Sequence, residues 1–217
     1  MTLDDMRSEL ILLLGNRSTS IIPLTRYNLW LNNAQREIVG AVEVPEASTT
    51  ATTAQVSGTA LYDVDSTIMV LYGVRCEHNN RLLTPTNYRK LYNTDIDSSG
   101  DPTHWMREGT QFRVYPVPSF SSGSRNFTQR GAKVMTPMSA TTDVPTLSEV
   151  WHECILLGGE YRGWRALREY QRYIAAKNEF LSMVRSRRTE DMIEDEHSDF
   201  GIQIRRSQIW RLKSVLP

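Results

Sequence analysis

Residues 100–118, GDPTHWMREGTQFRVYPVP, predict a β-hairpin in the middle of a largely helical chain. Asp101-Pro102 favours a turn, and His104–Met106 has the composition of a strand. Glu108-Gly109 turns the chain again, and Gln111–Tyr115 supplies the second strand. Because this stretch contains no cluster of catalytic side chains, we expect the hairpin to serve a surface contact.

The hairpin lies in a longer region, from Val44 to Pro145, where Thr, Ser, Gly and Pro surround short β-branched and aromatic runs. This composition is typical of strands and turns. One helical turn is expected over Thr86–Tyr92. The expected strands are Gln55–Val56, Ala60–Val64, Ile68–Cys76, Arg81–Leu83, His104–Met106, Gln111–Tyr115 and Gly131–Met135.

Two amphipathic helices are predicted before this region. Thr2 is a suitable N-cap for the first helix, which Gly15 ends. The second helix is expected to begin at Pro23 and to end near Gly40. A short connection between two short helices favours antiparallel packing.

One long helix is predicted after the β-rich region, because no proline occurs from Val150 to about Arg188. A glycine inside a helix costs about 1 kcal/mol relative to alanine, so Gly158 and its neighbours indicate a close approach of another backbone. A loosened or kinked helix is the alternative. The apolar stripe that we expect to pack includes Gly159, Gly163, Ala166, Tyr170 and Tyr173.

An arginine stripe, Arg165, Arg168 and Arg172, falls on the opposite side of this predicted helix. Two interpretations remain open. Guanidinium groups bind phosphates without regard to sequence, so the stripe is a candidate contact for DNA. Alternatively, it is a solvated face that pairs with Glu169 and with neighbouring chains.

The C-terminal segment has an acidic block over 190–199, followed by a basic stretch that also carries large apolar side chains. Such a composition favours a tail that becomes ordered on a partner. A strand that completes the chain's own core is the alternative. The candidate docking residues are Phe200, Ile202, Ile204, Arg205, Arg206, Ile209, Trp210 and Leu212.

We therefore predict an α+β fold: an antiparallel helical bundle of two N-terminal helices and one long C-terminal helix, with a small antiparallel β domain inserted and an extended C-terminal tail. The expected divisions are a helical pair over 1–43, the inserted β-rich domain over 44–145, the long helix over 146–188 and the tail over 189–217.

Several functional classes lack support in the sequence. The 25 basic and 25 acidic residues balance, so no net charge attracts nucleic acid or lipid, and no apolar run approaches membrane-spanning length. Cys76 and Cys154 match no disulfide framework or metal spacing, and Leu156 stands where a zinc-protease motif needs a second histidine. We expect no metal, cofactor or catalytic site, in a protein of a soluble compartment. An enzyme in which His104 or His152 meets carboxylates remains the alternative.

The order of these motifs resembles the head-to-tail connector proteins of tailed bacteriophages, also called portal adaptors or head completion proteins, over about residues 1–188. The resemblance rests on the turn Gly100-Asp101-Pro102, the strand ending in Tyr115-Pro116-Val117-Pro118, and the junction Val144-Pro145 before the final helix.

This resemblance implies a structural protein of the virion, made in the cytoplasm of the host bacterium and located at the head-tail junction. Such proteins form a ring, usually of twelve, beneath the portal, where they conduct double-stranded DNA and receive the tail. In that case the long helix packs against its copies, the arginine stripe lines the DNA conduit or a subunit contact, and the C-terminal tail binds the portal. Trp105 and Tyr115 then face a tail or nozzle protein. A nucleic-acid-binding module that uses the same arginines is the alternative function.

Overall fold

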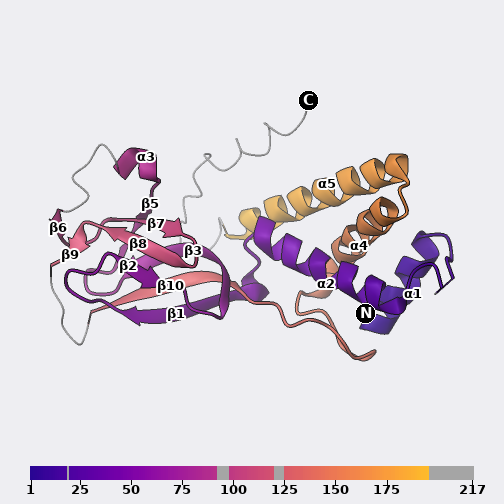
Figure 1. Ribbon diagram of the computed structural model, residues 1–217, viewed down its shortest axis with the longest axis horizontal. Coiled ribbons are helices and arrows are strands. Elements are labelled where there is room, and N and C mark those ends of the chain that lie inside the picture. Colours follow the sequence, from indigo (N-terminus) through magenta and orange to yellow (C-terminus); the bar gives the residue numbers. More distant parts are fainter. Residues whose placement is uncertain (19, 92–97, 120–124, 196–217) are drawn as a thin grey trace.

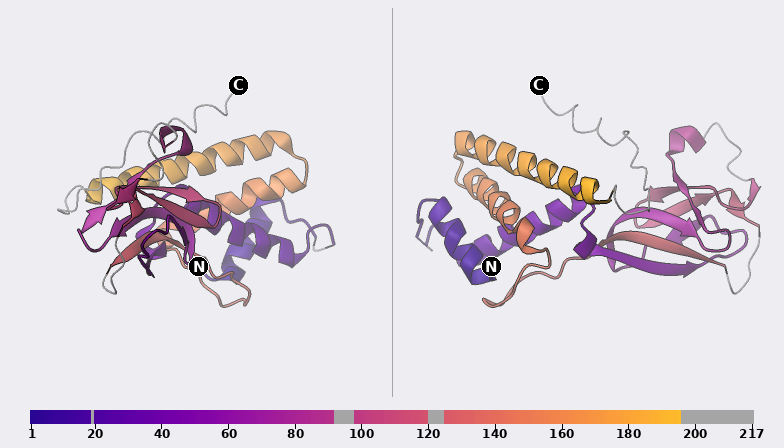
Figure 2. Two further views of the ribbon diagram at one scale, coloured as in Figure 1. Left: turned by 60° about the vertical axis from the view of Figure 1, so that its left-hand side comes forward. Right: turned by 180° about the vertical axis from the view of Figure 1, so that it is seen from behind.

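The computed structural model describes residues 1–18, 20–91, 98–119 and 125–195. They form an elongated molecule with helices at one end and sheets at the other (Figures 1 and 2). The chain begins in the helical part, passes through the sheets and returns to the helices. The described strands therefore lie between helices along the chain.

Four longer helices are found among the described residues, and the capping of the first follows the sequence pattern. The Thr2 Oγ1 accepts a hydrogen bond from the Asp5 N–H (3.3 Å), and the Thr2 N–H donates to Asp5 Oδ2 (2.8 Å). Both predicted N-terminal helices are confirmed. The bounds are α1 Leu3–Leu13, α2 Leu24–Ala41, α4 His152–Ala166 and α5 Tyr170–Asp195, with the short turns η1 Pro45–Ala47, α3 Tyr88–Leu91 and η2 Glu149–Trp151.

The prediction of a single long C-terminal helix is wrong, because the chain reverses between α4 and α5. Arg168 adopts a left-handed conformation with φ of 62°. Its N–H donates to the Arg165 carbonyl (3.2 Å), and the Glu169 N–H donates to the Trp164 carbonyl (3.0 Å). These two bonds satisfy the last carbonyls of α4 in the manner of a Schellman motif, and α5 then packs back along α4.

The described residues of the β part form two four-stranded sheets and one two-stranded sheet. The first sheet has the order β1-β10-β3-β4, the second β2-β8-β7-β5 and the small one β6-β9. The bounds are β1 Ser48–Ala54, β2 Leu61–Asp63, β3 Ile68–Cys76, β4 Arg81–Leu82, β5 Thr84–Pro85, β6 Ser99–Gly100, β7 His104–Glu108, β8 Gln111–Tyr115, β9 Val117–Pro118 and β10 Asn126–Lys133.

These sheets overturn the predicted fold class, a helical bundle with a small inserted β domain. The strands are extensive, and they form three sheets among the described residues. The predicted hairpin is present as β7 and β8, and β3 has the predicted bounds. The prediction at Gln55–Val56 missed β1, because the sequence STTATTA of Ser48–Ala54 has no apolar alternation that would reveal a strand.

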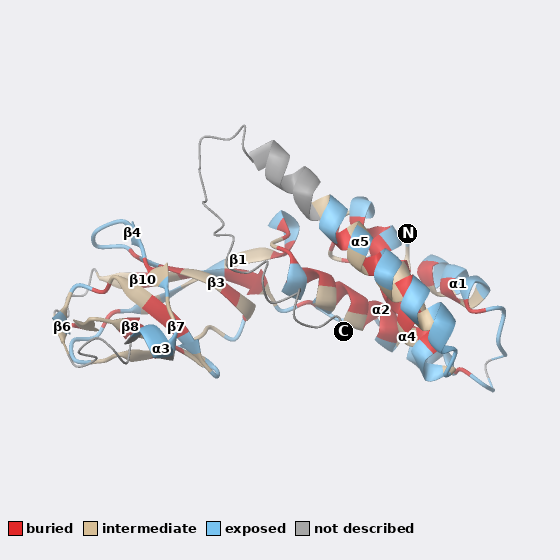
Figure 3. Ribbon diagram, turned by 90° about the horizontal axis from the view of Figure 1, so that it is seen from above, coloured by how far each residue is buried: buried red, intermediate tan, exposed pale blue. Residues whose placement is uncertain are grey.

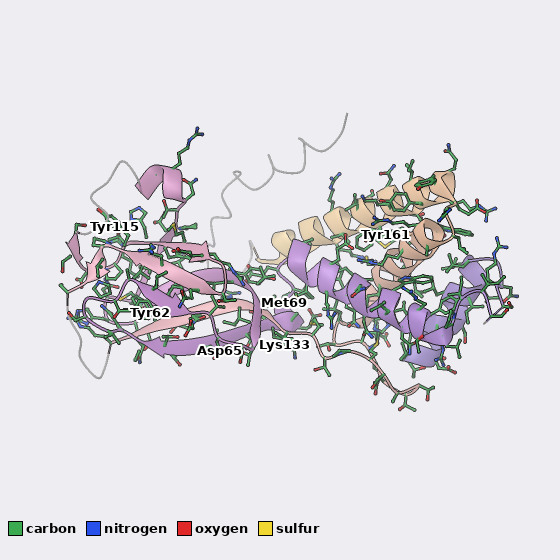
Figure 4. All side chains as sticks on the ribbon, in the orientation of Figure 1. Tyr62, Asp65, Met69, Tyr115, Lys133 and Tyr161 are labelled. Atoms are coloured by element: carbon green, nitrogen blue, oxygen red, sulfur yellow. The ribbon has the colours of Figure 1, made fainter. Side chains whose placement is uncertain are left out.

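Two hydrophobic cores hold the parts together (Figure 3). In the β core, the Tyr62 ring lies 5.5 Å from Phe112 and 5.0 Å from Phe127. The helical core extends across the junction, where the Tyr72 hydroxyl from β3 donates to the Val39 carbonyl of α2 (2.9 Å). Because Met69 on the same strand packs against that core, the end of the first sheet is joined to the helices (Figure 4).

Candidate assembly surfaces

The three arginines of the predicted stripe gather at the turn of the α4–α5 hairpin. Arg165 is the last residue but one of α4, Arg168 forms the turn and Arg172 lies in the first turn of α5. All three are exposed, and none forms a salt bridge within the described part of the chain. The turn thus converts a stripe along one helix into a compact basic cluster at one end of the molecule.

Trp164 orients one member of this cluster. The Arg172 guanidinium lies over the Trp164 ring at 4.6 Å from its centroid, and the buried Trp164 donates its Nε1–H to Glu160 (2.9 Å). This stacking is a cation–π contact, which holds the charge without neutralising it. A shallow hollow beside it is lined by Glu160, Trp164, Arg172, Ala175, Ala176 and Glu179.

The glycines of α4 face other helices of the same chain. A Cβ at Gly158 would lie 2.6 Å from the Ala34 Cβ on α2, and one at Gly163 would lie 2.4 Å from Leu14 at the end of α1. Gly159 likewise faces Leu10 of α1. The expected approach of another backbone is found at Gly158, where the added Cβ would lie 3.4 Å from the Ala34 Cα, whereas leucine side chains fill the space beside Gly159 and Gly163. Contacts between subunits are not needed to explain Gly159 and Gly163.

The remaining residues of the predicted packing stripe divide by exposure. Ala166 is exposed and Tyr170 is 66% exposed, beside the basic cluster. Tyr173 is half-buried, because its ring meets Tyr161 at 6.1 Å and its hydroxyl accepts a hydrogen bond from Lys177. Ala166, Tyr170 and the exposed Ile174 therefore offer apolar surface at this end of the hairpin.

A second apolar surface lies where α1 leads into α2. Its exposed side chains are Leu12, Leu13, Ile21 and Leu24. Because Leu14 meets Gly163, the end of α1 lies beside the C-terminal half of α4. Apolar side chains are thus exposed both at the α1–α2 connection and at the α4–α5 turn.

An ionic contact between α2 and α4, which the sequence pattern did not reveal, holds this arrangement. The Glu37 carboxylate accepts hydrogen bonds from Arg162 and from the Tyr161 hydroxyl. Arg162 also donates to the carbonyls of Gly158 (2.6 Å) and Asn33 (3.3 Å). Burial, followed by this bond to Glu37, raises the pKa of Tyr161 well above its usual value. Figure 4 marks Tyr161 between the helices.

Trp105 and Tyr115, the predicted tail-facing residues, lie on neighbouring strands of the β hairpin. Trp105 is only 6% exposed and belongs to the β core. Tyr115 is half-buried, and its hydroxyl accepts a hydrogen bond from the Ser98 Oγ (3.0 Å). Within one chain, therefore, Tyr115 has more surface available to a partner than Trp105 has.

The other predicted sites have simpler outcomes. The candidate portal-binding residues from Phe200 to Leu212 lie outside the described residues. In the described ranges, no group of three or more His, Cys, Asp and Glu side chains is placed to hold a metal ion. His152 is buried, and burial is the main cause that lowers its pKa. Among the described helices, none has the length and apolar character to cross a membrane.

The sequence model of one family, described as SU10 adaptor protein, matches residues 1–201. The comparison with curated proteins finds no match. The family match covers both the helices and the sheets, and it agrees with the resemblance to phage head-to-tail connectors. The chain therefore belongs to the SU10 adaptor protein family.

Proposed function

We propose that this phage structural adaptor assembles as a ring between the portal and the tail, with twelve copies as the expected number. The ring would conduct double-stranded DNA and would form the platform that receives the tail. The observation that carries this proposal is the family match over residues 1–201. A structural role also agrees with the apolar and basic side chains that are exposed at the helical end of the molecule.

Electron microscopy of the purified chain, alone and mixed with the portal protein of the same phage, tests the ring. We expect closed rings with one rotational axis, at least in the presence of the portal. Particles that remain monomeric in the mixture would contradict the proposal. The α4–α5 end, with Tyr170 and Ile174 exposed, is the first candidate for the contact between copies, because repetition around a ring turns weak contacts into a durable one.

The C-terminal tail is proposed as the portal-docking segment. Ile202, Ile204, Ile209 and Trp210 would bury apolar area, and Arg205 and Arg206 would orient the segment on acidic partner groups. Truncation after Asp195, the last residue of α5, should abolish portal binding in a pull-down. A milder change in the same segment is the full-length variant I202S/I204S, which should weaken portal binding but leave it detectable. Full portal binding by the truncated chain would refute tail docking.

The basic cluster is proposed to meet the DNA inside the ring. Since Arg165, Arg168 and Arg172 are exposed and lack acidic partners in the described part of the chain, their charge is available to phosphates. Reversing all three to Glu should reduce DNA retention or ejection without preventing ring formation. Reversal of the exposed Arg36 on α2 is the control. Unchanged particles would mean that the cluster is solvated or pairs between subunits.

A nucleic-acid-binding module is the second candidate, and the clustering of the same arginines at one turn is the observation that favours it. In that case the isolated monomer should bind plain duplex DNA, with an affinity that falls steeply as salt rises. Fluorescence anisotropy with a labelled duplex measures this. Salt-sensitive binding by the monomer, together with no rings on the portal, would favour the module over the adaptor ring.

A further inference from the structure

The open edges of the two larger sheets are unequally protected. The edge strands are β1 and β4 in the first sheet and β2 and β5 in the second. β4 is two residues long and carries Arg81, β5 is two residues long and contains Pro85, and β2 is three residues long and ends in Asp63. Short length, charge and proline are the features by which proteins prevent an edge from pairing with another chain.

β1 has none of these features. It is seven residues long, and its sequence STTATTA contains no charge, proline or glycine. Its pairing with β10 is regular from Ser48↔Ala132 to Ala54↔Asn126, whereas the irregularities of β10 fall on the side of β3. In the described part of the chain, no strand pairs with its other edge. β1 therefore presents a regular row of backbone donors and acceptors to another strand.

The sequence of this edge is self-complementary. Thr49-Thr50-Ala51-Thr52-Thr53 is the same in both directions around Ala51. Antiparallel pairing of two copies about Ala51 places Thr50 opposite the partner's Thr52, and places Ala51 opposite the partner's Ala51. Residues that oppose each other in an antiparallel pair share a face of the sheet, so the exposed threonines meet threonines. Such Thr–Thr pairs are favourable, and no like charges come together.

We propose that the free chain dimerises through β1, with two copies joined antiparallel about Ala51 into one continuous sheet. This contact is isologous, because the same patch is used on both copies, and it obeys a two-fold axis. It differs from the side-by-side contact of a ring, which is heterologous. The inference goes beyond the proposed function, since it describes the chain before assembly and the partner that covers its open edge.

Two charge variants test the register. In T50E/T52E, both opposed pairs hold like charges; in T50E/T52K, both hold opposite charges. The two variants share the change at Thr50, which lies opposite Arg130 of the same chain. We expect the dimer dissociation constant of T50E/T52E to exceed that of T50E/T52K at least about tenfold in sedimentation equilibrium at low salt. Equal constants, or a wild-type chain that is monomeric at every concentration, would overturn the proposal.

A cross-linking experiment tests the same pairing without charge. Chains carrying Thr50→Cys and chains carrying Thr52→Cys are oxidised separately and as a mixture. Opposed Cα atoms in an antiparallel pair are about 4.5–5.5 Å apart, within the range of a disulfide. Covalent dimers should form faster in the mixture than in either protein alone, and the native Cys76 and Cys154 are buried. Equal rates in all three samples would exclude the register. Neither experiment involves the portal, so its result is independent of the ring.

Discussion

The turn of the α4–α5 hairpin and the turn of the β7–β8 hairpin use nearly the same backbone conformation with different residues. Arg168 has φ of 62°, and Gly109 has φ of 64°. Glycine adopts this region without steric cost, and its presence after Glu108 made the β turn visible in the sequence. Arginine is a good helix former, so nothing at Arg168 indicated a reversal. The sequence therefore reveals a turn where a glycine occupies the left-handed position, and does not reveal it where an arginine does.

The two hairpins also pack by opposite means. β8 contributes Phe112, which is fully buried against two other aromatic rings. In α4, by contrast, Gly158 and Gly163 have no side chains, which lets Ala34 and Leu14 pack directly on the helix surface. The β hairpin should therefore be most sensitive to the loss of volume, and the helical hairpin to the gain of volume.

The largest expected effect is the loss of volume in the β core. Phe112→Ala should lower the free energy of unfolding by about 3–5 kcal/mol, because it leaves a cavity beside Tyr62 and Phe127. Urea denaturation followed by tryptophan fluorescence measures it. Tyr170→Ala on the exposed part of α5 is the control and should change stability little. Equal effects of the two substitutions would contradict the assignment of Phe112 to the core.

The gain of volume in α4 should be the next largest effect. Gly158→Ala should cost about 1–3 kcal/mol, because its new methyl group would lie 2.6 Å from the Ala34 Cβ. Gly40→Ala is the matched control, since Gly40 lies in α2, where a new methyl group would meet no atom within 4 Å, and this change should gain about 0.5–1 kcal/mol. Thermal unfolding monitored by circular dichroism compares both. A gain at Gly158 would mean that α2 does not approach α4 so closely.

The two turns should respond with opposite signs. Gly109→Ala should cost about 1 kcal/mol, because its positive φ is unfavourable for any residue with a Cβ. Arg168→Gly should gain about 0.5 kcal/mol, since relief of the same strain outweighs the added freedom of the unfolded chain. Urea unfolding of both variants measures the difference. A loss of stability at Arg168 would indicate that its side chain stabilises the turn.

The smallest expected effect is on the stability of the fold at low pH, through the Glu77 carboxyl group. Glu77 accepts hydrogen bonds from the Thr128 Oγ1 (2.5 Å) and the Asn126 Nδ2 (3.0 Å), and these bonds lower its pKa below the usual 4.5. A carboxyl group with a lowered pKa stabilises the fold above its unfolded pKa, and the stabilisation is lost as pH falls through the folded pKa. Glu77→Gln should therefore flatten the loss of stability below about pH 4.5 in acid titrations followed by circular dichroism. An unchanged profile would exclude Glu77 as a contributor.

At the candidate surfaces too, the sequence predicted some features and missed others. The glycines of α4 indicated a close approach, because each has an energetic cost that something must offset. They did not identify the approaching element, which is α1 for Gly159 and Gly163. The arginines were identified as a group, but their gathering at one end depended on the unpredicted turn. Trp105 was assigned to a surface, whereas the strand pairing directs it into the β core.

Local patterns were sufficient for the capped first helix, the second helix, the Gly109 hairpin and β3, because short-range spacing and capping chemistry decide these elements. The sequence also carried enough order of motifs to place the chain among phage connectors. The reversal at Arg168, the strand status of Ser48–Ala54 and the extent of the three sheets arose only from long-range packing. The residues that stabilise these features lie far away along the chain, so a local sequence pattern does not predict them.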